Sequence, residues 1–297
     1  MSVTAIVPVW NQHELTHRCL ASLRAQTRPF ARILVVDNGS ATPFSAPDVD
    51  ILQWPENLGF APAVNAGWRS ADTDHIAVIN NDVRLDPRWL EHLLATEAEF
   101  ATGKLFRPDG LIDGTFDLIS RGGFPWRAGH GRQDDPVWNE PREIAMTSFT
   151  AVLLRTRLRE RVGMLDESFG SYLEDVEFSM RCRRVGVRGQ YVPSAVGVHV
   201  GSATAGSWSP FMVRQIASNH AKLIARHWGS HHKQEVAVSR FLWRLLALRH
   251  GRSVTFPEVV PEPAEVPETD DEEIRRLQQA TGFDHYWRWY FRACHNE

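Results

Sequence analysis

The sequence predicts an α/β fold, and two observations support this. Over the first hundred residues, short apolar runs alternate with stretches whose apolar side chains recur at helical spacing, which is the pattern of βαβ units. Polar turn residues follow two of these apolar runs, at positions 37–40 and 80–82. Strands are therefore expected at residues 4–9, 32–36, 49–52 and 75–79, and helices at 15–25, 61–69 and 87–98.

The remainder of the chain is expected to be more varied. Residues 100–147 are rich in Gly, Asp and Arg and predict irregular strands and loops over a cleft. Further strands are expected at 145–154, 190–192 and 195–200, with a helix at 172–184. A helical extension at 206–256 follows, with helices at 211–228 and 236–248. Residues 257–273 hold four prolines and eight acidic residues, so we expect a linker there, before an aromatic terminal helix at 274–297.

The composition excludes several classes of protein. With 33 basic and 36 acidic residues among 297, the net charge of -3 creates no field that would attract nucleic acid. Cys19, Cys182 and Cys294 are far apart, which argues against a disulfide framework or a thiolate zinc site and predicts a reducing compartment. The N-terminus runs straight into the first strand, and no apolar run is long enough to span a bilayer. We therefore expect a cytoplasmic protein.

Two polar turns lie where an α/β sheet binds its ligands, beyond the carboxyl ends of strands. Asp37 is either ordinary turn chemistry or a carboxylate that accepts the imide N–H of a pyrimidine base. Asn80, Asn81 and Asp82 form an oxygen-rich cluster that suits Mg²⁺ or Mn²⁺ shared with a diphosphate. Helix capping is the alternative for this cluster, but the next helix is expected to begin four residues later. The two turns should share one cleft.

Three acidic residues crowd the start of the helix expected at 172–184. Glu174, Asp175 and Glu177 lie in its first turn, where the helix dipole favours negative charge. Good helix-start design explains the acids but not their number. Mutual repulsion raises the pKa of a carboxyl group, which a general base can use. His199 closes the last expected strand; alone, it is more often a core or surface histidine than a ligand.

P-loop, dinucleotide, zincin and nucleophile-elbow motifs are all missing from the sequence. Seven other segments are present, in this order: IVPVWN (6–11), VVDNGS (35–40), ENLGF with NAG (56–60, 65–67), INNDV (79–83), GMLDESF (163–169), YLEDVE (172–177) and HVGSAT (199–204). Taken together and in this order, they resemble family 2 glycosyltransferases of the glycosyltransferase-A fold, over about residues 3–204. The resemblance implies a Rossmann-like nucleotide-binding half, a mixed central sheet and a catalytic domain at 1–205.

The resemblance also implies where the donor binds. Asp37 would hold the nucleotide base, with Pro8 and Asn57 shaping the same pocket. Asp82 and His199 would be the metal ligands, with Asn80 and Asn81 beside the donor.

The implied reaction is an inverting transfer from a nucleotide diphosphate sugar to an acceptor hydroxyl. Asp175 matches the general base that takes the hydroxyl proton, and Glu174 stands beside it to position substrate or cap the helix. The metal would stabilise the departing diphosphate.

Two departures from the family pattern bear on the donor. Asn80 replaces the first acid of the metal motif, so one formal negative charge is left in the triplet and the site would be completed mainly by the donor diphosphate. The Asp37-Asn38 pair resembles rhamnosyltransferases, as does the stretch from Lys104 to Asp113. A dTDP-rhamnose donor is therefore favoured, with UDP-linked sugars as the alternative because uracil and thymine offer the same imide.

Alternatives remain open for the whole chain and for its helical extension. One alternative is a catalytically silent scaffold subunit, but this sequence retains Asp82, Asp175 and His199, which such a subunit does not need. The other is a nucleotidyltransferase, but the basic, glycine-rich N-terminal loop expected of that enzyme is missing from this sequence. By analogy the acceptor is a saccharide or a lipid-linked saccharide in surface polysaccharide assembly. The helix at 236–248 is apolar on one side and basic on the other. It would lie on the inner face of the membrane, or pack on the catalytic domain or in a homodimer.

Overall fold

The computed structural model describes residues 1–201 and 208–295, with the backbone alone for His295. The chain forms two compact units. Of the described residues, the sheet unit comprises 1–117 and 127–201, and the helical unit comprises 118–126 and the chain from residue 208 onward. The expected boundary at residue 205 and positions 202–204 of the HVGSAT segment lie outside the described residues. The boundaries at 256 and 273 stay predictions.

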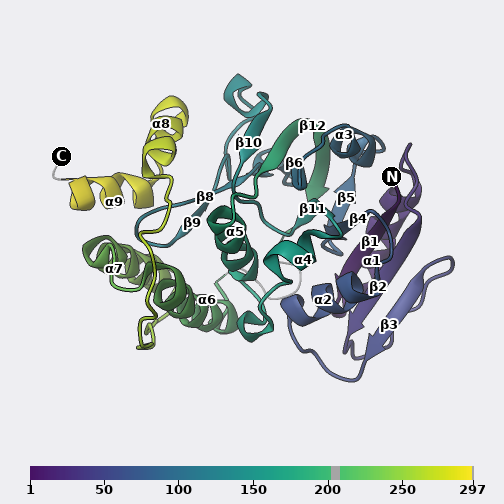
Figure 1. The fold of residues 1–297 in the computed structure, drawn as a ribbon, viewed down its shortest axis with the longest axis horizontal. Helices are drawn as coiled ribbons and strands as arrows, with labels where there is room; N and C mark the ends of the chain where they lie inside the picture. Colours follow the sequence, from purple (N-terminus) through teal and green to yellow (C-terminus); the bar gives the residue numbers. More distant parts are fainter. Residues whose placement is uncertain (202–207, 296–297) are drawn as a thin grey trace. The chain divides into compact units, whose positions relative to one another are not determined.

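The sheet unit is built on a mixed sheet, as predicted (Figure 1). Its main path runs β10-β12-β6-β11-β4-β1-β2-β3, with β5 paired to β12 and β7 to β6. Strands β1 to β4 pair in parallel, whereas β11 runs antiparallel to its neighbours. The bounds are β1 (Val3–Val9), β2 (Arg32–Asn38), β3 (Asp50–Trp54), β4 (His75–Ile79), β5 (Val83–Leu85), β6 (Phe100–Phe106), β7 (Ile112–Gly114), β10 (Arg142–Ile144), β11 (Ala151–Arg155) and β12 (Gly189–His199).

Helices pack on both faces of this sheet. Alternate residues of β1, from Val3 to Val9, join a core cluster with apolar side chains of α1 and α3. On the opposite face Ile6 meets α2, where a Cβ at Gly67 would lie 2.5 Å from the Ile6 side chain. The helical bounds of this unit are α1 (His13–Arg24), α2 (Phe60–Ser70), α3 (Trp89–Leu94), η1 (Pro136–Trp138), α4 (Leu158–Val162), η2 (Glu167–Phe169) and α5 (Glu174–Arg184).

Three expected elements of this unit differ in the structure. The helix expected at 87–98 is limited to α3, because the chain must turn after Leu94 to enter β6 at Phe100. The strands expected at 190–192 and 195–200 are one strand, β12, with a shift in register between Tyr191 and Val196. The strand expected from residue 145 begins at Ala151, since residues 145–150 form a loop.

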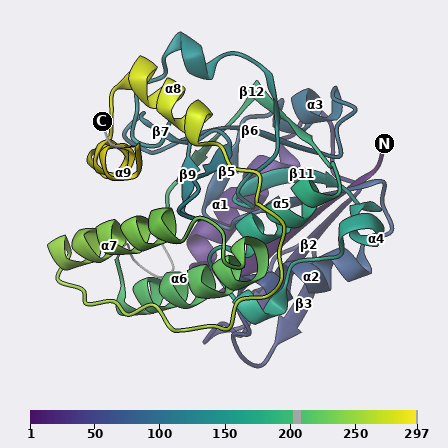
Figure 2. The ribbon, with the colours of Figure 1, turned by 60° about the vertical axis from the view of Figure 1, so that its left-hand side comes forward.

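The helical unit holds α6 (Pro210–Leu223), which continues into the π-helical turn η3 (Ile224–Trp228), then α7 (Lys233–Arg249), α8 (Asp271–Thr281) and α9 (His285–His295). Ser209 caps α6 by accepting the Met212 N–H, and Pro210 occupies the first turn. Figure 2 shows α6 and α7 side by side. Apolar side chains of the two helices pack in one cluster with Phe124 and Phe256, and Trp243 is its aromatic member from α7. Phe124 lies in the turn between β8 (Asp117–Ile119) and β9 (Pro125–Arg127).

The C-terminal region corrects one further expectation. The single terminal helix expected from residue 274 is two helices, because Gly282 takes a left-handed conformation (φ 93°) between α8 and α9. The residues from 252 to 270 form no helix or strand, in agreement with the proline-rich composition. Among the helices that the structure describes, none is long and apolar enough to cross a membrane.

Candidate active site

The two expected metal ligands meet at the carboxyl edge of the sheet. Asp82 follows β4, and His199 ends β12, where it pairs with Val83. Nε2 of His199 lies 3.2 Å from Oδ1 of Asp82, and both residues are buried. The structure therefore joins two residues that the sequence could relate only by resemblance.

A third residue completes this group, and no pattern in the sequence singled it out. Asp113 on β7 places Oδ2 2.9 Å from Nδ1 of His199 and 3.2 Å from Nη1 of Arg127. Burial raises the pKa of Asp113, but the His199 hydrogen bond and the Arg127 charge outweigh it and bring the pKa to about 2. Burial lowers the pKa of His199, yet its bonds to Asp113 and Asp82 raise that pKa to about 9.

This geometry fits a divalent cation held by two protein side chains. Two ligand atoms of an octahedral cation, each about 2.1 Å away, lie about 3 Å from one another. The 3.2 Å between Asp82 Oδ1 and His199 Nε2 is close to that distance. Across the described residues, no group of three or more His, Cys, Asp or Glu could hold a metal. The remaining ligands would therefore come from a diphosphate and from water.

The acids at the start of α5 have separate environments. Glu174 is buried, and its Oε2 has no hydrogen-bond partner in the structure described; burial and the neighbouring Asp175 hold its pKa well above the usual value. Asp175 accepts backbone N–H bonds from Val176 (2.8 Å) and Phe149 (3.3 Å). Glu177 instead pairs with Arg181 at 2.9 Å, so the third acid stabilises the helix.

Burial also raises the pKa of Asp175, while Arg127 offsets part of that rise. The turn that presents Glu174 and Asp175 is unusual. Tyr172 and Leu173 both have positive φ, 69° and 66°, a conformation that side chains other than Gly rarely adopt. Such backbone is found where a site requires it.

Arg127 lies among the carboxylates of this edge. Its Nη1 contacts Asp113, its Nε lies 3.9 Å from Asp117 Oδ1, and it also interacts with Asp175. Burial of Asp117, with repulsion from Asp175 and Asp113, raises the pKa of Asp117 to about 7 despite Arg127. Arg127 thus connects Asp113, the partner of His199, with the acidic start of α5.

The residues expected around the nucleotide base lie at the same edge of the sheet. Because β1 pairs in parallel with both β2 and β4, Asp37 near the end of β2 and Asp82 after β4 lie at the same edge, on either side of β1. Asp37 is fully buried and accepts from Ser40 N (3.0 Å), Phe44 N (2.7 Å) and Gln53 Nε2 (2.8 Å). Turn chemistry therefore occupies most of this carboxylate, and its role toward a base stays a prediction.

The loops after β2 and β3 are locked together. Asn38 donates to Asn57 Oδ1 (3.0 Å), and a Cβ at Gly39 would lie 2.3 Å from the Glu56 carbonyl carbon. Pro8 is half-buried near the end of β1.

In the 80–82 turn, Asn81 donates to Thr16 Oγ1 at 3.1 Å. Asn80 keeps a buried Oδ1 without a partner among the described residues. The buried Asn81 side chain thus secures the turn to α1, whereas Asn80 retains an unused acceptor beside Asp82.

Comparison with known proteins identifies the family. Residues 4–148 match the model described as glycosyl transferase family 2. The N-acetylglucosaminyl-diphospho-decaprenol L-rhamnosyltransferase of Mycobacterium tuberculosis is 31% identical over 218 residues, which cover 61% of this chain and 70% of that relative. The chain belongs to glycosyltransferase family 2.

Two further matches define the extent of the likeness. The pre-mycofactocin glycosyltransferase of Mycobacterium tuberculosis is 29% identical over 206 residues, 66% of this chain, and the chain spans only 42% of that relative's length. The crystal structure of GalNAc-T7 with UDP, GalNAc and Mn²⁺ superposes with a TM-score of 0.65 at 12% identity, over 99% of this chain and 56% of the other. That identity shows the fold alone, and the expected glycosyltransferase-A fold is confirmed.

For this glycosyltransferase, sequence reasoning missed Asp113, Asp117 and Arg127. In the sequence, Asp113 is only the last residue of the stretch from Lys104 that resembles rhamnosyltransferases. A buried carboxylate on a three-residue strand is the signal that would have marked Asp113, but burial is visible only once the sheet is assembled.

Proposed function

We propose that this glycosyltransferase is a metal-dependent inverting enzyme that moves a sugar from a nucleoside diphosphate to an acceptor hydroxyl. The observation that carries the proposal is the pairing of Asp82 with His199 at the edge where Asp175 also lies, with Arg127 interacting with Asp113 and Asp175 between them. Asp82 lies in the turn after β4, His199 ends β12 and Asp175 lies in α5, so only an assembled fold unites them.

Asp175 is the proposed general base. It takes the proton of the acceptor hydroxyl while that oxygen bonds to C1 of the sugar and the C1–O bond to the diphosphate breaks, which inverts the anomeric centre. Each carboxylate oxygen is aimed by one backbone N–H and keeps acceptor capacity. The raised pKa of Asp175, caused by burial, suits a group that must accept a proton.

Asp82 and His199 are the proposed ligands of Mg²⁺ or Mn²⁺, with Asn80 and Asn81 beside the donor. When bound, such a cation stabilises the charge on the departing diphosphate. Asp37, Pro8 and Asn57 would line the base pocket. Three donors already occupy Asp37, and a carboxylate accepts about four, so one acceptor position remains for an imide N–H.

The proposed donor is dTDP-rhamnose, and the proposed acceptor is a lipid-linked saccharide used in surface polysaccharide assembly. The support is the relative named as a rhamnosyltransferase of a diphospho-decaprenol-linked sugar. UDP-linked sugars are the alternative donors, because uracil presents the same imide as thymine.

Release of nucleoside diphosphate from dTDP-rhamnose and from a panel of UDP-sugars tests this function. Each donor is incubated with Mn²⁺, with Mg²⁺ and with EDTA. We expect metal-dependent release from dTDP-rhamnose, faster when a lipid-linked acceptor is added. A lack of release from every donor in both metals, with nucleotide still bound, would support the silent scaffold instead.

We propose further that α7 contacts the inner face of the membrane, where a lipid-linked acceptor is found. This helix buries Val236, Ser239, Trp243 and Ala247. It leaves larger apolar side chains outside, with Phe241 57%, Leu245 45% and Leu248 59% exposed. These three lie at i, i+4 and i+7, on one face.

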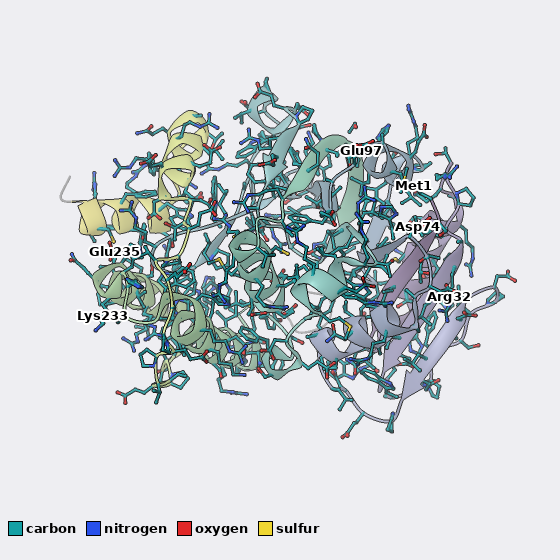
Figure 3. All side chains as sticks on the ribbon, in the orientation of Figure 1. Met1, Arg32, Asp74, Glu97, Lys233 and Glu235 are labelled. Atoms are coloured by element: carbon teal, nitrogen blue, oxygen red, sulfur yellow. The ribbon has the colours of Figure 1, made fainter. Side chains whose placement is uncertain are left out.

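Charge on α7 favours an anionic lipid surface. Arg244 and Arg249 are exposed beside the apolar stripe. Lys233 and Glu235 mark the first turn of the helix in Figure 3, and Glu235 lies 3.8 Å from His232. Each of Arg240, Arg244 and Arg249 is the sequence neighbour of one residue of the stripe, about 100° away around the helix, so the basic residues flank the stripe. Arg240 and Arg244 also lie over the ring of Phe256.

Sedimentation with anionic liposomes tests this contact. We expect binding at low salt, release at high salt, and loss of binding in Phe241→Ser/Leu245→Ser. Concentration-dependent dimerisation that the same double variant abolishes, without liposome binding, would show a homodimer interface instead.

A further inference from the structure

The carboxylate of Asp113 faces three basic side chains at this edge of the sheet, those of His199, Arg127 and His130. It is 7% exposed, on the short strand β7. Oδ2 faces His199 Nδ1 (2.9 Å) and Arg127 Nη1 (3.2 Å), and Oδ1 lies 3.9 Å from His130 Nδ1. His130 Nδ1 also lies 2.7 Å from the Asp113 carbonyl oxygen. Removal of this carboxylate would leave Arg127 and His199 without their buried acidic partner.

The His199 ring has two nitrogens with different neighbours. Nδ1 faces Asp113, and Nε2 faces Asp82. An ionised carboxylate can only accept, so Nδ1 must carry the proton that is shared with Asp113. Nε2 also carries a proton while the ring is charged. When Nε2 is deprotonated, as a cation ligand requires, its lone pair is directed toward the Asp82 side and the remaining proton stays on Nδ1.

Without Asp113 the neutral ring has another choice. The proton can move to Nε2 and be donated to Asp82 Oδ1, which lies 3.2 Å away. That single hydrogen bond would occupy both candidate ligand atoms at once. The Asp113 carboxylate therefore decides whether Asp82 and His199 can bind a cation or are hydrogen-bonded to each other.

We propose that Asp113 is a positioning residue, which holds His199 in the tautomer that leaves Nε2 and Asp82 available to a divalent cation. This inference rests on the proposed metal site. Arg127 contacts the same Asp113 oxygen as His199 does. Gly114 leaves room for the Arg127 side chain, since a Cβ at 114 would lie 2.5 Å from Arg127 Cδ. On β7, Asp113 thus hydrogen-bonds His199, and the next residue, Gly114, leaves space for Arg127.

Mn²⁺ binding tests the proposal without reference to turnover. Free Mn²⁺ is measured by electron paramagnetic resonance as protein is titrated, with and without UDP, in the parent and in Asp113→Asn. Loss of such a supporting carboxylate weakens metal affinity about 10- to 100-fold, and we expect a decrease in this range. Transfer by Asp113→Asn should recover most of its parental rate when Mn²⁺ is raised to saturation.

Asp117→Asn is the matched control. Asp117 is also buried and faces Arg127, at 3.9 Å, but it makes no contact with His199 in the structure described. We expect its Mn²⁺ affinity to stay within about 3-fold of the parent, well below the loss expected on removing the carboxylate that holds the histidine. An equal loss in both variants would mean that Asp113 acts only by balancing Arg127, and would overturn the proposal.

Two further results separate the possible failures. Parental Mn²⁺ affinity in Asp113→Asn, with affinity lost in Asp82→Ala and His199→Ala, refutes the positioning role alone. Parental affinity in all three variants refutes the metal site itself. Should Asp113→Asn fail to fold, ¹⁵N NMR of the parent with Mg²⁺ and UDP decides the question, with the His199 signals assigned from His199→Gln. A protonated Nδ1 is expected, and an unprotonated one overturns the inference.

Discussion

Replacement of Asp175 by Asn separates the proposed role of this side chain as general base from its role as hydrogen-bond acceptor for the backbone. Asn keeps the shape and one carbonyl oxygen, so Val176 N, at 2.8 Å, can retain its acceptor. The amide nitrogen would then face the Phe149 N–H, now bonded at 3.3 Å, and that bond is lost at a cost of about 1 kcal/mol. A domain stable by roughly 5–15 kcal/mol remains folded after such a loss. Removal of a general base slows the reaction on the order of 10²- to 10⁴-fold, about 3–5 kcal/mol in the barrier.

Transfer rates at saturating donor and Mn²⁺, together with donor affinity and thermal unfolding, measure these effects separately. We expect Asp175→Asn to bind donor with near-parental affinity while the transfer rate collapses. Glu174→Gln is the matched control, because Glu174 is buried with an unpartnered Oε2 and its amide relieves repulsion with Asp175. We expect its rate to fall less than about 10-fold, below the range for loss of a base. Retained transfer in Asp175→Asn with collapse in Glu174→Gln would refute the assignment.

Three other predictions follow from the same structure. Asp82→Ala should abolish turnover, as should EDTA in the parent; a parent fully active in excess EDTA contradicts the metal assignment. His220 is fully buried, and burial, with the nearby Arg240 charge, lowers its pKa to about 3. In the neutral ring Nε2 bonds the Gly122 carbonyl and Nδ1 accepts from Arg240. Because the folded protein keeps this ring neutral, its contribution to the free energy of unfolding is complete above pH 6.5 and is lost as the pH falls toward 3. From pH 6.5 to 5 the parent should lose about 2 kcal/mol more than His220→Gln in urea unfolding, and equal losses would exclude His220 as the titrating group. Gly39→Ala should destabilise far more than Gly110→Ala, since both residues have positive φ but only Gly39 has backbone within 2.3 Å of the added Cβ; equal unfolding midpoints would contradict this packing.

Local patterns were sufficient for much of the sheet unit. Apolar residues at helical spacing placed α1, whose Thr16, Cys19, Leu20 and Leu23 are buried. Polar turns after apolar runs placed Asp37 and Asp82 at one edge, because parallel strands of βαβ units end on the same side. Such features are encoded within a few residues of one another, so they can be recognised before the chain is folded.

The partners of the site were decided by the tertiary structure alone. The contacts of Asp113 with His199 and of Arg127 with Asp113 depend on how β7, β12 and the end of β9 are brought together. Likewise, amphipathicity predicted the helix α7 but not which of its apolar residues stay exposed. The packing of the helical unit buries Trp243 and Ala247 and leaves Phe241 and Leu245 at the surface. Sequence periodicity defines the elements, since their hydrogen bonds and faces are local. Pairings between distant residues depend on register and packing, which no local pattern encodes.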